Sequence, residues 1–248
     1  MKKPPQTTRN SGASQTGAPP YRISRSKIDL FLNCPKCFYL DRRLNIVPPS
    51  NFPFSLNSAV DILLKKEFDI YRAKAQAHPL MKTAGIQAVP YNHPQIGLWR
   101  DSLKGGITYA CPNTNLLITG AVDDVWINSK EKLIIVEYKA TAKEHEVSID
   151  ADWQKSYKRQ MEVYQWLFRK NGFKVVDTGY FLYCNGLIDR EAFNQRLDFD
   201  VSLIPYQGSD AWIDGVLKSI DQCLSLEDAP KSGQDCVYCQ YRLAVGNR

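Results

Sequence analysis

The chain has no long apolar run and very little histidine. No stretch approaches the roughly 18 to 20 consecutive apolar residues that a membrane span requires. Residues 1–5 are MKKPP and polar residues follow them, so the beginning lacks the apolar core of a secretory signal. The three histidines, His78, His93 and His145, show no metal-ligand spacing, and we expect them at the surface. Together these absences predict a cytoplasmic protein that is not attached to a membrane.

A disulfide framework is also excluded, because cysteines in a reducing compartment are not expected to form disulfides. Four of the seven cysteines form two Cys-x-x-Cys pairs, Cys34 with Cys37 and Cys236 with Cys239. Two such pairs in one chain predict a tetrathiolate metal site, which would clip the first helix to the C-terminal segment. The spacing within each pair suits structural zinc. The other three cysteines are expected to be buried thiols.

Length and composition predict a globular protein. The 248 residues suffice to bury a full core, and 44% hydrophobic and 23% charged residues are ordinary proportions. Residues 1–20 are rich in Pro, Gly, Ser, Thr and Gln without apolar periodicity, and they predict a disordered leader before one domain over residues 21–248. The formal net charge of +6 permits a polyanionic partner but does not establish one.

A change of periodicity along the chain predicts a mixed α/β domain. Apolar residues recur at helical spacing before residue 78 and again from residue 153, and strand-like apolar runs lie between and after these segments. No internal repeat is present, and residues 78–106 give no clear pattern. The predicted helices cover residues 26–34, 56–77, 153–170 and 210–226, and the predicted strands cover 116–127, 132–141, 174–184 and 195–203.

The segment VEYKAT ends an apolar run with two opposite charges. Because side chains of a strand alternate between its faces, Glu137 and Lys139 share one face and Tyr138 lies on the other. A polar turn over residues 128–131 would fold this strand onto the preceding one, which places Asp123 across from Glu137. Two carboxylates with an amine beside them suit a Mg²⁺ ion that activates water for attack on a phosphate. On spacing alone, a Glu137–Lys139 ion pair at an exposed strand end explains the residues equally well.

Asp123 followed by Glu137-x-Lys139 resembles the paired acids and lysine of the PD-(D/E)XK nucleases. Four further stretches are similar to the RecB-like branch, which includes CRISPR-associated exonucleases with an iron–sulfur cluster. Gln160 and Tyr164 lie four residues apart on a predicted helix, hence on one face, where they could support Lys139 or reach the substrate. The four stretches that are similar to the RecB-like branch are SKIDLFLNCPKCFYL at residues 26–40, GAVDDV at 120–125, QMEVY at 160–164 and CVYC at 236–239.

The resemblance implies a restriction-endonuclease-like α/β fold: a mixed central sheet flanked by helices, with N- and C-terminal segments clipped by the four-cysteine site. It implies a nuclease that hydrolyses DNA with Mg²⁺ or Mn²⁺, acting as an exonuclease on single-stranded or end-bearing DNA in repair, recombination or CRISPR adaptation. The family's usual metal-binding histidine on the second helix is replaced by Asp61, which is also a metal ligand. By resemblance, the catalytic residues are Asp123, Glu137, Lys139, Gln160 and Tyr164, and the metal ligands are Asp61, Asp123, Glu137 and the Tyr138 carbonyl.

The identity of the metal at the cysteines stays open. The similar exonucleases hold an iron–sulfur cluster with one N-terminal and three C-terminal cysteines, whereas no cysteine follows Cys239 here. The resemblance therefore favours an iron–sulfur cluster in which Cys37 supplies the missing ligand, with structural Zn²⁺ as the alternative.

Two other functions compete with the nuclease. The replaced histidine is compatible with a catalytically weak or inactive nucleic-acid-binding protein of the same fold, and an assembly protein would use the acids only in ion pairs. DNA is the expected partner in the first two cases. No helicase motor is recognisable in the chain, so a helicase or CRISPR-adaptation protein would be a separate partner.

Overall fold

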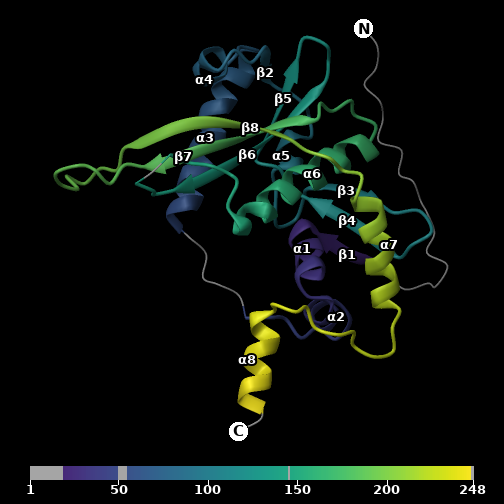
Figure 1. The fold of residues 1–248 in the computed structure, drawn as a ribbon. Coiled ribbons are helices and arrows are strands. Elements are labelled where there is room, and N and C mark those ends of the chain that lie inside the picture. Colours follow the sequence, from purple (N-terminus) through teal and green to yellow (C-terminus); the bar gives the residue numbers. More distant parts are fainter. Residues whose placement is uncertain (1–18, 50–54, 145, 247–248) are drawn as a thin grey trace. The chain divides into compact units, whose positions relative to one another are not determined.

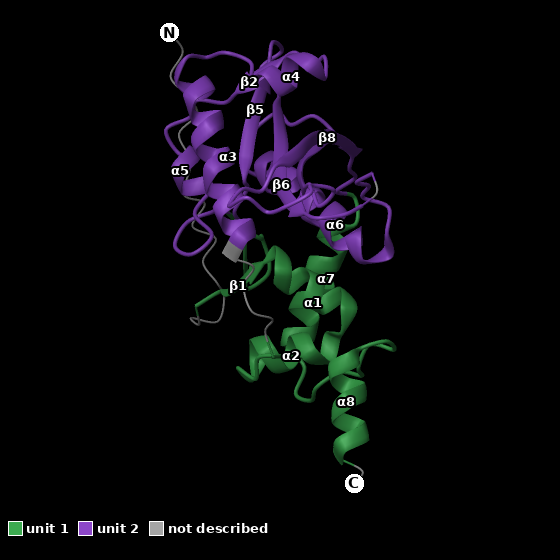
Figure 2. Cartoon of the chain, turned by 90° about the vertical axis from the view of Figure 1, so that its left-hand side faces the viewer, with its two compact units in different colours: residues 1–51, 108–119, 211–248 green, residues 52–107, 120–210 purple. Residues whose placement is uncertain are grey.

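A computed structural model of the chain describes residues 19–49, 55–144 and 146–246 (Figure 1). The chain forms two compact units, drawn in different colours in Figure 2. Unit 1 comprises residues 1–51, 108–119 and 211–248, and unit 2 comprises residues 52–107 and 120–210. Most of the predicted leader, residues 1–18, lies outside the described residues, so that leader and the domain boundaries stay predictions. Among the described helices we find none with the length and apolarity of a membrane span, and the cytoplasmic location stays a prediction.

Unit 2 is a five-stranded sheet with helices packed on it. Its strands are β2 (Ala88–Pro90), β5 (Asp124–Asn128), β6 (Leu133–Thr141), β7 (Thr178–Gly186) and β8 (Phe199–Gln207). Its helical segments are α3 (Ser55–Ala73), α4 (Pro79–Thr83), α5 (Ile96–Trp99), the short 3-10 helix η1 (Asp152–Gln154) and α6 (Lys155–Lys170).

The sheet of unit 2 is mixed, as the sequence predicts. Its strand order is β2-β5-β6-β7-β8. The pair β6 and β7 is parallel and is connected through α6, whereas the other pairs are antiparallel. A parallel pair needs a crossover of this kind, because a tight turn can only join antiparallel strands. The helix predicted over 153–170 supplies that crossover.

Strand β6 lies between β5 and β7 and is buried on both faces, which explains its continuous apolar run. On one face, Val136 and Tyr138 join a core cluster with Phe68 from α3. On the opposite face, α6 is so close to the sheet that a side chain at Gly179 would stand 2.3 Å from the Met161 sulfur. The helices α3 and α6 therefore cover opposite faces of the sheet, and both reach the end of β6 that carries the charged residues (Figures 1 and 2).

The single strand predicted over residues 116–127 is wrong, because this stretch forms two strands in two different sheets. Strand β4 (Leu116–Gly120) ends at Gly120, and β5 begins at Asp124. Gly120 is packed so tightly that a Cβ there would lie 2.6 Å from the Tyr164 ring. The hairpin of β5 and β6 nevertheless has the predicted register, with Asp124 opposite Val136. The three residues between the strands release Asp123 from regular pairing at the point where β6 becomes polar.

Unit 1 holds a three-stranded sheet in the order β1-β4-β3, in which β1 runs parallel to β4. The helix predicted over 26–34 is confirmed, and Pro35 ends it as predicted. Pro35 also begins a second, unpredicted helix, because proline is well tolerated at the first helical position. The elements are β1 (Tyr21–Ser24), α1 (Arg25–Asn33), α2 (Pro35–Arg43), β3 (Ile107–Ala110), β4, α7 (Ile213–Leu224) and α8 (Val237–Gly246); Ile107 and Gly120 themselves belong to unit 2.

Candidate functional site

The end of the β5–β6 hairpin brings Asp123 and Glu137 together, as the sequence predicts. The Asp123 amide donates to Glu137 Oε1 at 3.4 Å, and the Tyr138 amide donates to Asp123 Oδ2 at 2.8 Å. The carboxylate of Glu137 is fully buried, whereas the Asp123 side chain is 23% exposed. One acid therefore lies at the base of the site and the other nearer to solvent.

Lys139 lies beside Glu137 and is held from several sides. Its ammonium lies 3.3 Å from Glu137 Oε2 and donates to Gln160 Oε1 at 3.2 Å. It also lies 4.7 Å from the centre of the Tyr157 ring, within cation–π range. The predicted Glu137–Lys139 contact exists, but at a buried strand end, because the Lys139 side chain is only 13% exposed. An ion pair on an exposed strand end therefore does not describe these residues.

Gln160 links the acid to the lysine. Its side-chain amide donates to Glu137 Oε2 at 2.5 Å and to the Tyr164 hydroxyl at 3.4 Å, while its carbonyl accepts from Lys139. Gln160 and Tyr164 are both buried, at 7% and 5% exposure. Gln160 therefore contacts Lys139 from the buried side of the site, and the roles of Gln160 and Tyr164 stay predictions.

Lys65 connects Asp61 to Asp123, because its ammonium contacts both carboxylates. The sequence analysis missed Lys65. The Lys65 ammonium lies 2.8 Å from Asp61 Oδ2 and 3.5 Å from Asp123 Oδ1. Burial raises the pKa of the Asp61 carboxyl and the Asp123 charge raises it further, while Lys65 opposes both effects. Spacing of four residues on a helix signals the Asp61–Lys65 pair in the sequence, but nothing local signals the contact with Asp123.

Asp124, the neighbour of Asp123, points into the protein instead of the site. Its fully buried carboxylate lies 2.5 Å from the Arg72 guanidinium and 2.8 Å from that of Arg100. It also accepts a hydrogen bond from the Tyr138 hydroxyl at 3.0 Å. Burial and the Asp124 charge raise the pKa of Tyr138 well above its ordinary value, so the phenol keeps its proton. The network links β5 to β6 at Asp124, the residue that follows Asp123.

The oxygen donors at this site suit a hard divalent cation such as Mg²⁺ or Mn²⁺. The oxygen atoms of these ligands are spaced more widely than the sulfur atoms of the four cysteines. Among the described residues, the only group of three or more acidic, histidine or cysteine ligand atoms that all lie within 4.8 Å of one another is the four-cysteine group. The Lys65 ammonium instead lies between the carboxylates of Asp61 and Asp123.

The four predicted cysteines do converge, within unit 1. Sulfur separations are 3.8 Å from Cys34 to Cys239, 3.5 Å from Cys37 to Cys236 and 3.7 Å from Cys37 to Cys239. Burial raises the pKa of the Cys34 thiol, but hydrogen bonds from the amides of Gly233 and Cys37 outweigh burial and bring it to about 7. A thiolate at Cys34 is thus stabilised in advance for metal binding.

The sequence analysis expects the histidines at the surface, and this expectation is wrong for His78. His78 is 4% exposed and stacks on Phe68 at 4.4 Å between ring centres. Its Nε2 lies 2.8 Å from Glu67 Oε1. His93 is partly buried and stacks on Trp99, also at 4.4 Å. His145 lies outside the described residues.

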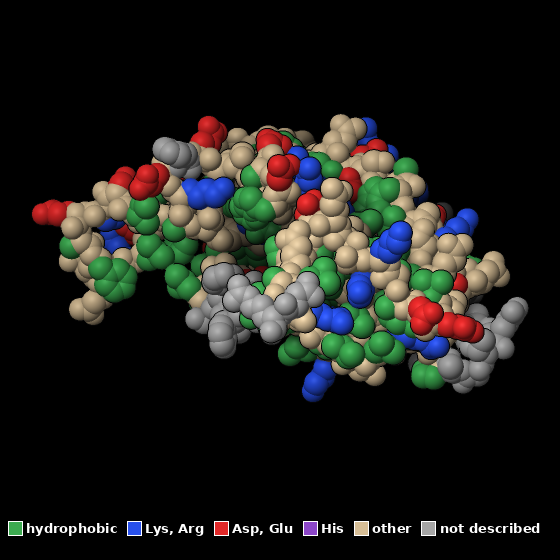
Figure 3. Space-filling model, turned by 60° about the horizontal axis from the view of Figure 1, so that its bottom comes forward, with side chains coloured by type: hydrophobic (Ala, Val, Ile, Leu, Met, Phe, Trp, Pro, Cys, Tyr) green, Lys and Arg blue, Asp and Glu red, His purple; other side chains and the backbone are tan. Residues whose placement is uncertain are grey.

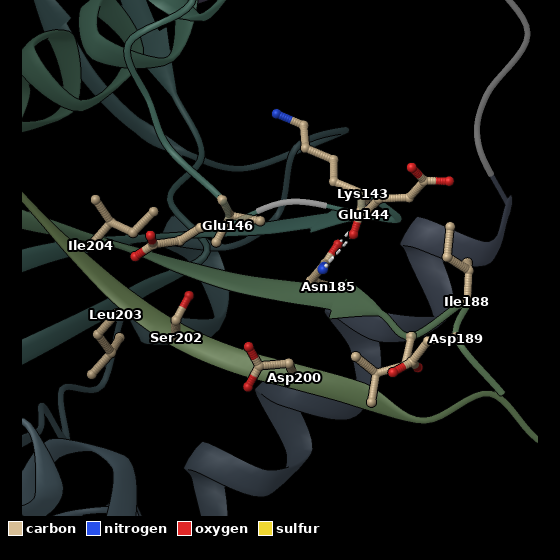
Figure 4. A pocket seen from close by; sticks show the side chains of 12 residues that line it. Lys143, Glu144, Glu146, Asn185, Ile188, Asp189, Asp200, Ser202, Leu203 and Ile204 are labelled. Carbon is tan, nitrogen blue, oxygen red and sulfur yellow. Dashed lines mark hydrogen bonds between the residues drawn. The ribbon is translucent and has the colours of Figure 1, made fainter.

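A cavity of about 660 Å³ lies along β7 and β8, away from the predicted site residues. Figure 4 shows its lining, where Asn185 bonds to the backbone of Lys143. Among the charged side chains of this lining, the acidic ones outnumber the single basic one, Lys143, which disfavours the phosphates of a nucleic acid. On the face drawn in Figure 3, basic and acidic side chains are interspersed with apolar ones, and neither sign covers it. The acidic lining residues are Glu144, Glu146, Asp189 and Asp200.

Two acids at the end of a hairpin with a lysine beside them form the arrangement that the sequence analysis expects of a nuclease, and the family comparison supports that class. The model of the PD-(D/E)XK nuclease superfamily matches residues 59–244, well over half of the chain. The chain therefore belongs to the PD-(D/E)XK nuclease superfamily, whose members are in general metal-dependent nucleases. The matched span includes Asp61, Asp123, Glu137, Lys139 and the two residues of α6, whereas Cys34 and Cys37 lie before it.

Other comparisons add little. None of the curated proteins compared matches the chain. Eight chains of solved structures match it. One, titled "Crystal structure of SSO0001", is 17% identical, with 94% of this chain and 87% of that chain covered and a TM-score of 0.36. A likeness at that TM-score supports no argument about function.

Proposed function

We propose that the chain is a metal-dependent DNA nuclease, acting as an exonuclease on single-stranded or end-bearing DNA. One observation carries the proposal: Asp123 and Glu137 meet at the end of the β5–β6 hairpin, and the Lys139 ammonium lies 3.3 Å from Glu137. Superfamily membership supports hydrolysis of phosphodiester bonds. Water would add to phosphorus, one phosphorus–oxygen ester bond would break, and the departing oxygen would take up a proton.

The residues at the hairpin end have distinct proposed roles. Asp61, Asp123, Glu137 and the Tyr138 carbonyl would hold Mg²⁺ or Mn²⁺, which supplies polarisation of the phosphate and acidification of a bound water. Lys139 would orient the attacking water and offset negative charge that develops on the phosphate oxygens.

Gln160 is proposed as a positioning residue. Its amide bonds to both Glu137 and Lys139, which fixes the separation of the acid and the ammonium. The Tyr164 hydroxyl accepts a third bond from the same amide and limits its rotation. Groups that orient metal ligands in this way usually affect activity strongly although they do not touch the substrate.

We further propose that the chain is a RecB-like member that acts in repair, recombination or CRISPR adaptation with a separate helicase or adaptation protein. The cysteine pairs that flank the nuclease residues support this assignment. The sulfur positions, however, fit one metal ion better than an iron–sulfur cluster. Four sulfurs bound about 2.3 Å from one Zn²⁺ stand about 3.8 Å apart. Three of the sulfur pairs here are 3.5–3.8 Å apart, and all four sulfurs lie within 4.8 Å of one another. A cluster places iron and sulfide atoms between the cysteines and needs wider spacing, so we propose structural Zn²⁺.

Cleavage of labelled single-stranded and duplex DNA with Mg²⁺ or Mn²⁺ tests the proposed activity. We expect wild-type protein to cleave and EDTA to abolish cleavage. Lys139→Met should lower the rate about 100-fold or more, as loss of a group that assists proton transfer does. Lys132→Met, at an exposed lysine just before β6, is the matched control and should cleave normally.

Three outcomes would contradict the nuclease. These are no cleavage by folded, metal-loaded protein, full activity of Lys139→Met, and an equal loss in Lys132→Met. Metal-independent DNA binding without any cleavage would instead identify the inactive nucleic-acid-binding protein.

A further inference from the structure

Lys65 places a positive charge where the nuclease residues need a metal ion. It lies on α3, one helical turn after Asp61, and its ammonium contacts carboxylate oxygens of both Asp61 and Asp123 at 2.8 and 3.5 Å. The three side chains are partly exposed, at 22% for Lys65, 33% for Asp61 and 23% for Asp123. The Lys65 side chain is therefore partly accessible to solvent, as are the two carboxylates that it contacts.

The two lysines of the site differ in how they are held. Lys139 is fixed by Glu137, by the Gln160 carbonyl and by the Tyr157 ring. The contacts found for the Lys65 ammonium are with the two carboxylates that a metal ion would use. A lysine ammonium is a compact charge on a flexible four-carbon chain, so it can turn toward water when a stronger cation arrives.

We propose that Lys65 is a built-in counter-ion that competes with the divalent cation for Asp61 and Asp123. A divalent ion bound by these oxygens at about 2.0–2.2 Å would lie next to the ammonium, and like charges so close repel each other. Pairing with Lys65 therefore opposes binding of the metal at these two carboxylates. Lys65 stabilises the metal-free protein and lowers its affinity for the ion.

This inference rests on the proposed function, and binding of Mn²⁺ without DNA tests it directly. Isothermal titration of full-length protein should give an affinity about tenfold tighter or more for Lys65→Met than for wild type, on the scale by which groups around metal ligands alter affinity. Lys65→Arg keeps the charge and should bind as wild type does. Lys66→Met, at the exposed next residue of α3, is the matched control and should also match wild type.

Thermal unfolding supplies a second readout. Without metal, Lys65→Met should melt at a lower temperature than wild type, and Mn²⁺ should raise its melting temperature by more. Lys65→Gln serves the same test if the methionine variant fails to fold. Asp123→Asn should lose Mn²⁺ binding.

The possible failures are distinguishable. Binding that depends on Asp123 but is equal or weaker in the Lys65→Met and Lys65→Gln variants would overturn the counter-ion alone. Binding that Asp123→Asn leaves unchanged would overturn both the counter-ion and the proposed metal site. An equal gain of affinity in Lys66→Met would reduce the effect to general surface charge and would also overturn the counter-ion.

Discussion

The backbone amide of Tyr138 donates a hydrogen bond to the carboxylate of Asp123, with 2.8 Å between N and Oδ2. Val136 is the last residue of β6 that pairs with β5. Beyond it, the Tyr138 amide bonds to the Asp123 side chain instead of to a backbone carbonyl of β5. It fixes one oxygen of Asp123 and leaves the other, Oδ1, directed at Lys65. The position of the acid is thus set by the backbone of the strand that carries Glu137.

Asp124 should be essential for stability. Asp124→Ala would remove the buried carboxylate that Arg72 and Arg100 share and leave the half-exposed Asp69 as their remaining acidic partner. Removing one partner of a buried ion pair typically costs about 3–5 kcal/mol. Urea unfolding at neutral pH measures the loss. Asp150→Ala removes a mostly exposed partner of Lys158 and should change the free energy of unfolding by no more than about 1 kcal/mol. A loss at Asp124 no larger than at Asp150 would show that the buried network contributes little.

Gln160→Ala should impair catalysis more than binding. Loss of the amide frees both Glu137 and Lys139, and removal of such a supporting group typically lowers activity about 10- to 100-fold. Steady-state kinetics should show the loss in kcat with an unchanged KM for DNA. Gln165→Ala, five residues later on α6, removes an amide that bonds to the carbonyls of Val176 and Asp177. It should lower stability without lowering kcat, and an equal loss of kcat in both variants would deny Gln160 a specific role.

Unfolding should depend on pH through His93. Burial lowers the pKa of His93 below its ordinary value of 6.5. The unfolded chain therefore takes up a proton more readily, and the stability contribution is complete above about pH 6.5 and is lost as the pH falls toward the lowered value. Protonation would also remove the acceptor for the Gln95 amide, which donates to His93 Nδ1 at 3.2 Å.

Urea unfolding between pH 7.5 and 5.5 measures this dependence (the range spans about one unit on either side of the ordinary histidine value). Wild type should lose stability toward the acid end, and His93→Gln should lose less over the same range. Identical pH profiles for the two proteins would exclude His93 as the source.

Cys236→Ser should release the metal of unit 1. One tetrathiolate ion needs all four sulfurs, so zinc content should fall from about one ion per chain toward zero. Elemental analysis measures it, together with absorbance near 400 nm, a region where iron–sulfur proteins absorb. Cys111 lies outside the four-cysteine group, so the Cys111→Ser variant should keep the metal. Brown protein that contains iron and sulfide would refute the single zinc ion.

The sequence predicts the hairpin site well because its determinants are local. The polar turn at residues 128–131 sets the register of Asp123 and Glu137, and strand alternation places Lys139 on the same face. Gln160 and Tyr164 share a helix face for the same kind of reason. The convergence of the cysteines follows from ligand chemistry, which overrides a separation of about 200 residues.

The sequence predictions fail where contacts between residues far apart in the chain determine the structure. Residues 116–127 are mostly apolar and are consistent with one strand in sequence, whereas the strand ends at Gly120, against which the Tyr164 ring packs. The burial of His78 depends on stacking with Phe68 from another helix. Lys65 resembles an ordinary helix-surface lysine in sequence, and its contact with Asp123 appears only once α3 is packed on the sheet.

The cysteine site also has a consequence for synthesis of the protein. Cys34 and Cys37 emerge from the ribosome early, whereas Cys236 and Cys239 follow roughly 200 residues later. A nascent chain therefore carries half of the proposed metal site until all of unit 2 has been translated. Products that stop before residue 239 would lack a ligand of the proposed site, so retention of the proposed ion would distinguish chains that contain all four cysteines from shorter ones.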